Sequence, residues 1–82
     1  MVPGKLYSSS FWFSVYYPSN SETSTRFPSL GELNRMVYDT ISTRDIFLVL
    51  EVRKSTLKIL HNGRIGYIWT HELPKNWARE IR

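Results

Sequence analysis

IFLVLEVRKSTLKILHNGRIGYIW, residues 46–69, decides the fold of this chain. Within it, the segments 46–52, 56–61 and 64–69 alternate in the manner of β-strands, and Asn62-Gly63 separates the last two. An Asn-Gly pair between two such segments is the strongest short-range signal for a β-hairpin, because both residues tolerate the positive φ angles of a type I′ turn. The stretch therefore predicts three strands joined by short turns.

The alternation also predicts which side chains face the core. Segment 46–52 opens with an almost continuous apolar run, which is typical of a central strand covered on both faces. In segment 64–69, the side chains of Ile65, Tyr67 and Trp69 share one face, and we expect that face to point toward the core.

The first half of the chain has less regular signals. Residues 4–7 and 11–17 have the character of extended segments, and the second is rich in aromatic residues. The segment at about 18–28, PSNSETSTRFP, is almost wholly small and polar, so it buries too little apolar surface to offset the entropy of ordering it. We expect a mobile loop there.

Helix and strand signals compete in residues 29–41. Ser29 and Glu32 have the spacing of a capping box, which predicts a helix from Leu30 to about Arg35. Gly31 weakens that helix by about 1 kcal/mol relative to alanine, and segment 36–41 has the β-branched content of a strand. We favour a short helix followed by a short strand, within a long early loop.

Length and composition limit the function. A chain of 82 residues is one domain, 1–82. It buries roughly 60% of its unfolded surface, so there is little room for a deep catalytic cavity. The absence of cysteine excludes disulfides and thiolate metal sites. No apolar run has the length of a membrane-spanning helix or of a signal peptide. We therefore expect a soluble, cytoplasmic protein that does not bind a membrane.

The net charge of +4 is unevenly distributed. Residues 1–43 contain three basic and three acidic side chains, so the excess of eight basic over four acidic groups lies in residues 44–82. Such asymmetry is compatible with a face that binds polyanions and with an ordinary solvated surface.

The order of elements resembles an SH3-like barrel from about Asp45 to Ile81. Residues 63–69 are similar to the segment before the 3₁₀ turn of SH3 domains, with Trp69 in place of the usual proline. The resemblance implies a small, mainly β barrel of about five strands. It does not imply binding of proline-rich ligands, because Leu6-Tyr7 is only a fragment of the early aromatic motif and no paired tryptophans follow residues 53–55.

A second resemblance covers most of the chain. It rests on PGKLY at 3–7, the aromatic block at 11–18, the segment at 41–51, and Lys58-Ile59-Leu60 with Gly66-Tyr67-Ile68. This pattern is similar to small, uncharacterised SH3-like proteins of tailed phages that infect marine cyanobacteria. The resemblance implies a protein made inside an infected bacterial cell and directed at a host component. It transfers no catalytic residue.

The residue pattern does not indicate catalysis or metal binding. His61 and His71, with Asp45 or Glu72, are the nearest approach to a metal site, but a zinc site needs three or four converging ligands, which Cys and His cannot supply here. No Gly-x-Ser-x-Gly elbow is present. We expect a non-enzymatic protein without a metal or cofactor.

The favoured function is a protein-interaction module, because an aromatic content of 15% is high for so small a core. Alternation within residues 11–17 sends some aromatic side chains outward. The contact candidates are Phe11, Phe13, Tyr16, Tyr17 and Phe27. The alternative role of these aromatics is to close the barrel or pack against the helix. A homodimer formed through edge strands or the same aromatics is also compatible with the sequence.

Nucleic-acid binding is the alternative function. The basic residues that flank the hairpin region are Arg53, Lys54, Lys58 and Arg64. Phe47, Tyr67 and Trp69 are the candidates for base stacking, which is worth about 1–3 kcal/mol per base. The placement of Tyr67 and Trp69 on the predicted core face argues against this role, so structural aromatics are preferred.

Overall fold

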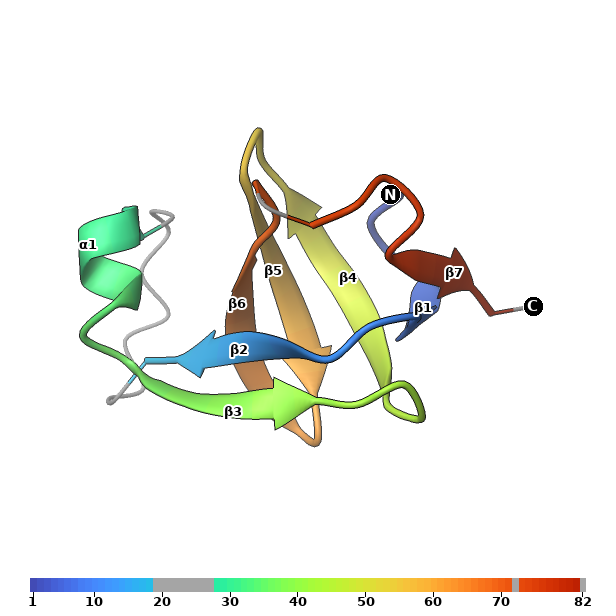
Figure 1. Ribbon diagram of the computed structural model, residues 1–82, viewed down its shortest axis with the longest axis horizontal. Helices are drawn as coiled ribbons and strands as arrows, with labels where there is room; N and C mark the ends of the chain where they lie inside the picture. Colours follow the sequence, from blue (N-terminus) through green and yellow to red (C-terminus); the bar gives the residue numbers. More distant parts are fainter. Residues whose placement is uncertain (19–27, 72, 82) are drawn as a thin grey trace.

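The computed structural model describes residues 1–18, 28–71 and 73–81, and this part of the chain is mainly β (Figure 1). Its elements are β1 (Leu6–Ser9), β2 (Phe13–Tyr17), α1 (Leu30–Leu33), β3 (Val37–Ile41), β4 (Ile46–Val52), β5 (Thr56–His61), β6 (Arg64–Trp69) and β7 (Ala78–Glu80). The strands of the described residues form one antiparallel sheet of seven, in the order β3-β2-β6-β5-β4-β1-β7.

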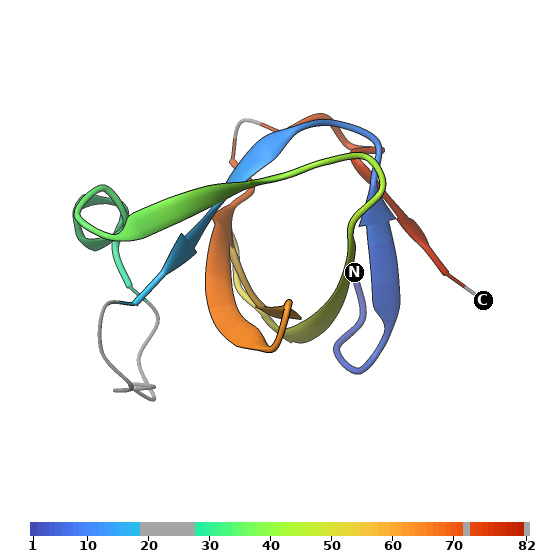
Figure 2. The same ribbon diagram turned by 90° about the horizontal axis from the view of Figure 1, so that it is seen from below.

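The sheet curls around its interior but does not close (Figure 2). The described strands β3 and β7 are its two edges and do not pair with each other. The prediction of a mainly β chain is confirmed, whereas a closed SH3-like barrel of about five strands is not. The loop expected at about 18–28 lies almost entirely outside the described residues.

The predicted hairpin between β5 and β6 is confirmed. His61 pairs with Arg64 across a two-residue loop, in which φ is 53° at Asn62 and 75° at Gly63. Two consecutive positive φ angles are the requirement of a type I′ turn.

The predicted capping box is also confirmed. The Ser29 hydroxyl accepts a hydrogen bond from the Glu32 N–H at 3.3 Å, and a Glu32 carboxylate oxygen accepts one from the Ser29 N–H at 3.2 Å. The helix ends after four residues and β3 follows, which is the predicted order. The side chain of Leu33, the last residue of α1, is fully buried.

The main core fills the interior of the curled sheet. Its large buried side chains come from six strands and the segment before β7: Tyr7, Val15, Tyr17, Ile41, Phe47, Val49, Leu57, Ile59, Ile68 and Trp77. The Phe47 ring stacks on the Trp77 ring with centroids 5.8 Å apart. Gly66 lies where β2 crosses β6, and a Cβ atom there would be 2.8 Å from Val15 Cγ2. This glycine therefore permits a close approach of the two strands.

Two predictions about strand faces are wrong. The core face of β6 carries Gly66 and Ile68, because these residues pair with Ile59 and Leu57 of β5, whose side chains are in the core. Ile65, Tyr67 and Trp69 consequently lie on the opposite face, where Tyr67 is nevertheless buried at 3% exposure and Ile65 and Trp69 are half-buried. Strand β4 is also not covered on both faces, since Ile46 on its outer face is 52% exposed.

Candidate functional site

A row of aliphatic side chains crosses the outer face of the sheet. Leu6 of β1 pairs with Leu48 of β4, Leu48 pairs with Leu60 of β5, and Leu60 pairs with Ile65 of β6. Directly paired residues of antiparallel strands share a face, and this face is opposite to that of the buried Phe47 and Ile59. We call Leu6, Leu48, Leu60 and Ile65 the aliphatic row.

The aliphatic row is open to solvent and has apolar neighbours. Leu6 is 45% exposed and Leu60 is 37% exposed, while Leu48 and Ile65 are half-buried. Ile81, which is 36% exposed, donates its N–H to the Leu6 carbonyl and extends the row beyond β1. Ile46, two residues before Leu48 on the same face of β4, is 52% exposed. Contiguous exposed apolar surface of this kind commonly marks an interaction site.

A second group of exposed side chains lies on β2 and β3. Tyr16 pairs with Tyr38, and their ring centroids are 6.1 Å apart. Tyr38 is 63% exposed, Tyr16 is half-buried, and Trp12, immediately before β2, is 73% exposed. Because Phe13 packs on the core, alternation places Trp12 on the same outer side as Tyr16. We call Trp12, Tyr16 and Tyr38 the aromatic platform.

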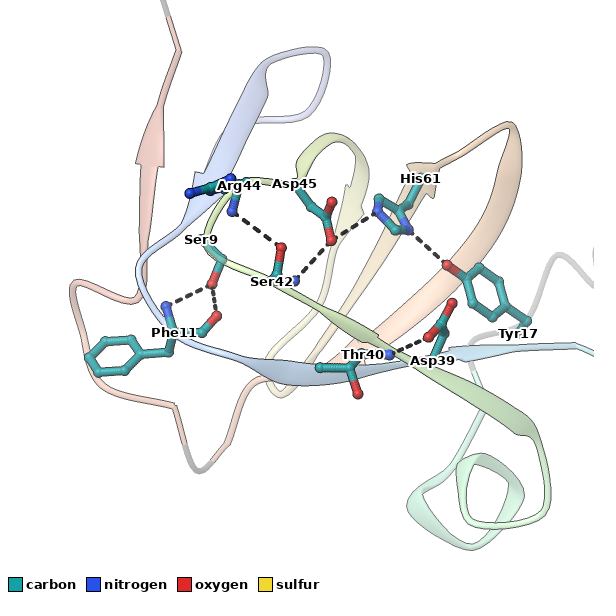
Figure 3. Close-up of polar contacts among 9 residues, drawn as sticks. All are labelled: Ser9, Phe11, Tyr17, Asp39, Thr40, Ser42, Arg44, Asp45 and His61. Carbon is teal, nitrogen blue, oxygen red and sulfur yellow. Dashed lines mark hydrogen bonds and ion pairs between the residues drawn. The ribbon is translucent and has the colours of Figure 1, made fainter.

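The structure divides the predicted protein-contact residues between core and surface. Phe11 is 42% exposed and its N–H donates to the Ser9 hydroxyl at 3.0 Å (Figure 3). Tyr16 lies on the outer face. Phe13 packs edge-on against Trp77 at 4.9 Å, and Tyr17 is buried. Phe27 lies outside the described residues.

The predicted basic residues do not gather on one face. Arg53 forms an ion pair with Glu51 at 3.1 Å, and the exposed Lys54 lies beside it in the turn before β5. Arg64 lies beyond the opposite end of β5, with its guanidinium 4.1 Å from the centre of the Tyr17 ring. Lys58 lies between these ends, in the outward alternation of β5.

A buried polar cluster links three elements (Figure 3). The Tyr17 hydroxyl of β2 and Nδ1 of His61 in β5 share a hydrogen bond of 2.8 Å. His61 Nε2 lies 3.7 Å from a carboxylate oxygen of Asp45, in the turn before β4, and that oxygen accepts the Ser42 N–H at 2.9 Å. Burial raises the pKa of Tyr17 above its ordinary value of 10.0; Asp39 reinforces this effect and Arg64 opposes it.

Sequence reasoning missed this cluster. His61 follows Leu57 and Ile59 at a spacing of two, so alternation alone indicates that its side chain faces the core. No local signal connects it with Tyr17 or Asp45. Of the predicted metal-ligand candidates, His61, His71 and Asp45 lie within the described residues and Glu72 does not, and no group of three or more potential ligands is found among the described residues. His71 is exposed, with its ring 5.9 Å from that of Trp69.

Comparison with known proteins identified no relative of this chain. No protein-family model matches the chain, and neither curated proteins nor solved structures gave a significant match. No helix in the described ranges combines the length and apolar character needed to cross a membrane. The aliphatic row, the aromatic platform and the polar cluster are the candidate functional features of the described residues.

Proposed function

We propose that this protein is a non-enzymatic interaction module that binds a partner protein through the aliphatic row. The observation that carries the proposal is the unbroken register Leu6–Leu48–Leu60–Ile65 across four adjacent strands. A soluble partner surface that covers these side chains removes apolar area from water, which is the main driving force of protein association.

The size of the row suits the centre of an interface. Adjacent strands are about 4.8 Å apart, so the row with Ile81 extends over about 19 Å. Apolar side chains free of charge typically form the buried centre of an interface, and polar groups surround them. The partner that fits is a protein with an uncharged aliphatic or aromatic patch.

The identity of the partner is proposed from the second sequence resemblance. If the chain is a cyanophage protein with an SH3-like fold, it acts in the cytoplasm of an infected bacterium, and the partner is a host protein. A second copy of this chain is the competing occupant of the row.

Charge substitution in the row tests the proposal. Leu60→Lys places an ammonium group in the middle of the row, and the partly exposed site lets the long side chain reach water, so the fold is retained. Val52→Lys is the matched control, since Val52 and Leu60 are both 37% exposed and Val52 lies outside the row. Each immobilised variant is incubated with a cyanobacterial lysate, and captured proteins are purified and titrated directly.

The expected result is a purified partner whose affinity falls at least about tenfold with Leu60→Lys, a loss of about 1.4 kcal/mol, and is unchanged by Val52→Lys. A partner that binds both variants equally contradicts the proposed surface. Sedimentation of the protein alone identifies self-association: a wild-type dimer that becomes monomeric with Leu60→Lys assigns the row to a second copy and overturns the host-partner assignment.

A further inference from the structure

We propose that the aromatic platform binds single-stranded nucleic acid by base stacking. This site is distinct from the aliphatic row, which belongs to β1, β4, β5 and β6, and its argument does not depend on the proposed protein partner. It shares only Lys58 with the basic residues of the 53–64 hairpin, which are dispersed.

The platform has the form of a shallow stacking surface. Tyr16 and Tyr38 are adjacent across the β2–β3 pair. Trp12, immediately before β2, is four residues from Tyr16 in the sequence, which corresponds to about 13 Å at the rise of an extended chain. Ser14 and Thr40, the pair next to the tyrosines, share the same face. Because the side chains of Ser14 and Thr40 are small, the aromatic rings project farther from this surface than their neighbours do.

The register extends the platform toward a cation. Tyr16 pairs with Tyr67 of β6, and Tyr67 pairs with Lys58 of β5, so Lys58, Tyr67, Tyr16 and Tyr38 form one cross-strand series. Tyr67 is buried at 3% exposure, so Lys58, Tyr16 and Tyr38 are the members of the series that a ligand can reach. Glu51 continues the series beyond Lys58, but its carboxylate is already paired with Arg53 at 3.1 Å.

Two further cations lie beyond the two ends of β3, the strand that carries Tyr38. Arg35 precedes β3 and Arg44 follows it, and both are exposed. Within the described ranges, no ion pair includes Arg35, Arg44 or Lys58. The acidic residue of β3, Asp39, pairs with the core residue Val15 and therefore faces away from the platform.

This combination selects the ligand class. Exposed aromatic rings provide stacking surfaces for bases, and flanking cations attract a phosphate backbone, which is how proteins bind single strands without reading their sequence. A proline-rich peptide also binds aromatic surfaces, but it gains nothing from three unpaired cations. Charge complementarity therefore favours the nucleic acid.

The test is fluorescence anisotropy of labelled dT12 and U12 at 50 mM and 200 mM salt. Tyr38→Ala and Trp12→Ala should each weaken binding about 5- to 150-fold, the range of one stacked base. Tyr38→Phe should retain most of the affinity, because the ring is kept. Val37→Ala is the matched control, since Val37 is 62% exposed and Tyr38 is 63% exposed on the same strand, and it should leave the affinity unchanged.

Several results would overturn the proposal. One is no measurable binding of either oligonucleotide at 50 mM salt. Another is binding that is lost with salt but is indifferent to Tyr38→Ala and Trp12→Ala, which would show phosphate attraction without stacking. A third is preferential binding of a labelled proline-rich dodecapeptide with the same dependence on Tyr38. Comparison of dT12 with U12 decides between DNA and RNA, and a Leu60→Ala variant should bind both like the wild type.

Discussion

The phenol oxygen of Tyr17 lies 2.8 Å from Nδ1 of His61, although the two residues are 44 positions apart in the sequence. Both side chains are only 3% exposed. The hydrogen bond therefore joins the end of β2 to the end of β5 inside the curled sheet, and it satisfies two polar groups that water does not reach.

Tyr17→Phe tests the energetic weight of this hydrogen bond. The substitution keeps the ring but leaves His61 Nδ1 buried without its partner. We expect the free energy of unfolding to fall by about 1–3 kcal/mol, the cost of an unsatisfied buried polar group. Urea denaturation measures the change. Tyr38→Phe, at a site 63% exposed, should change stability little; an equal loss there would show that the effect is not due to the buried hydrogen bond.

The raised pKa of Tyr17 predicts loss of stability in alkali. Burial, reinforced by Asp39, raises the pKa above 10.0, and burial followed by Glu51 does the same for Tyr67. An unfolded tyrosine ionises near pH 10 while the folded one stays neutral, so stability is retained below pH 10 and falls as the pH rises toward the folded pKa. Melting temperatures between pH 8 and 11.5 should show this decline, and Tyr17→Phe should make it shallower. A flat profile would contradict the assignment.

Gly66→Ala should be strongly destabilising. The added methyl group would lie 2.8 Å from Val15 Cγ2 and 3.0 Å from Tyr17 Cε1. Overpacking of this kind costs about 1–3 kcal/mol. The matched control is Gly31→Ala, where the nearest atom is 3.9 Å away and alanine favours the helix. In a double-mutant cycle, Val15→Ala should recover part of the Gly66→Ala loss; purely additive effects would exclude the contact.

Ser29→Ala should destabilise the region of α1. The serine hydroxyl accepts the Glu32 N–H and also contacts the Glu32 carboxylate at 3.2 Å, and loss of an N-cap costs about 1 kcal/mol. Amide hydrogen exchange at residues 32–36 measures the local effect. Ser10→Ala, at another exposed serine, is the control and should leave that exchange unchanged.

Features that depend on neighbouring residues were predictable from the sequence. The Asn62-Gly63 turn follows from the φ preferences of two residues, and the start of α1 follows from hydrogen bonds between Ser29 and Glu32. The assignment of Leu57 and Ile59 to one face of β5 follows from the period of a strand. In each case the interacting groups are close in sequence, so their spacing carries the information.

The choice of face in β6 was not predictable in this way. Both of its alternations are apolar, one with Ile65 and Tyr67 and the other with Gly66 and Ile68, so periodicity cannot decide between them. Pairing with β5 and the crossing of β2 over Gly66 decide it. This choice turns Ile65 outward and completes the aliphatic row.

The sequence by itself determined the strand-rich character of this protein, its hairpin and its capped helix, because these depend on local backbone preferences and on the period of the apolar pattern. Only the tertiary structure decided which side chains share a surface. The strand order β2-β6-β5-β4-β1 aligns Leu6 with Ile65 and Tyr16 with Lys58 through intermediate strands. It also buries Tyr17 against His61. These alignments depend on contacts between segments far apart in the chain, which a one-dimensional pattern does not specify.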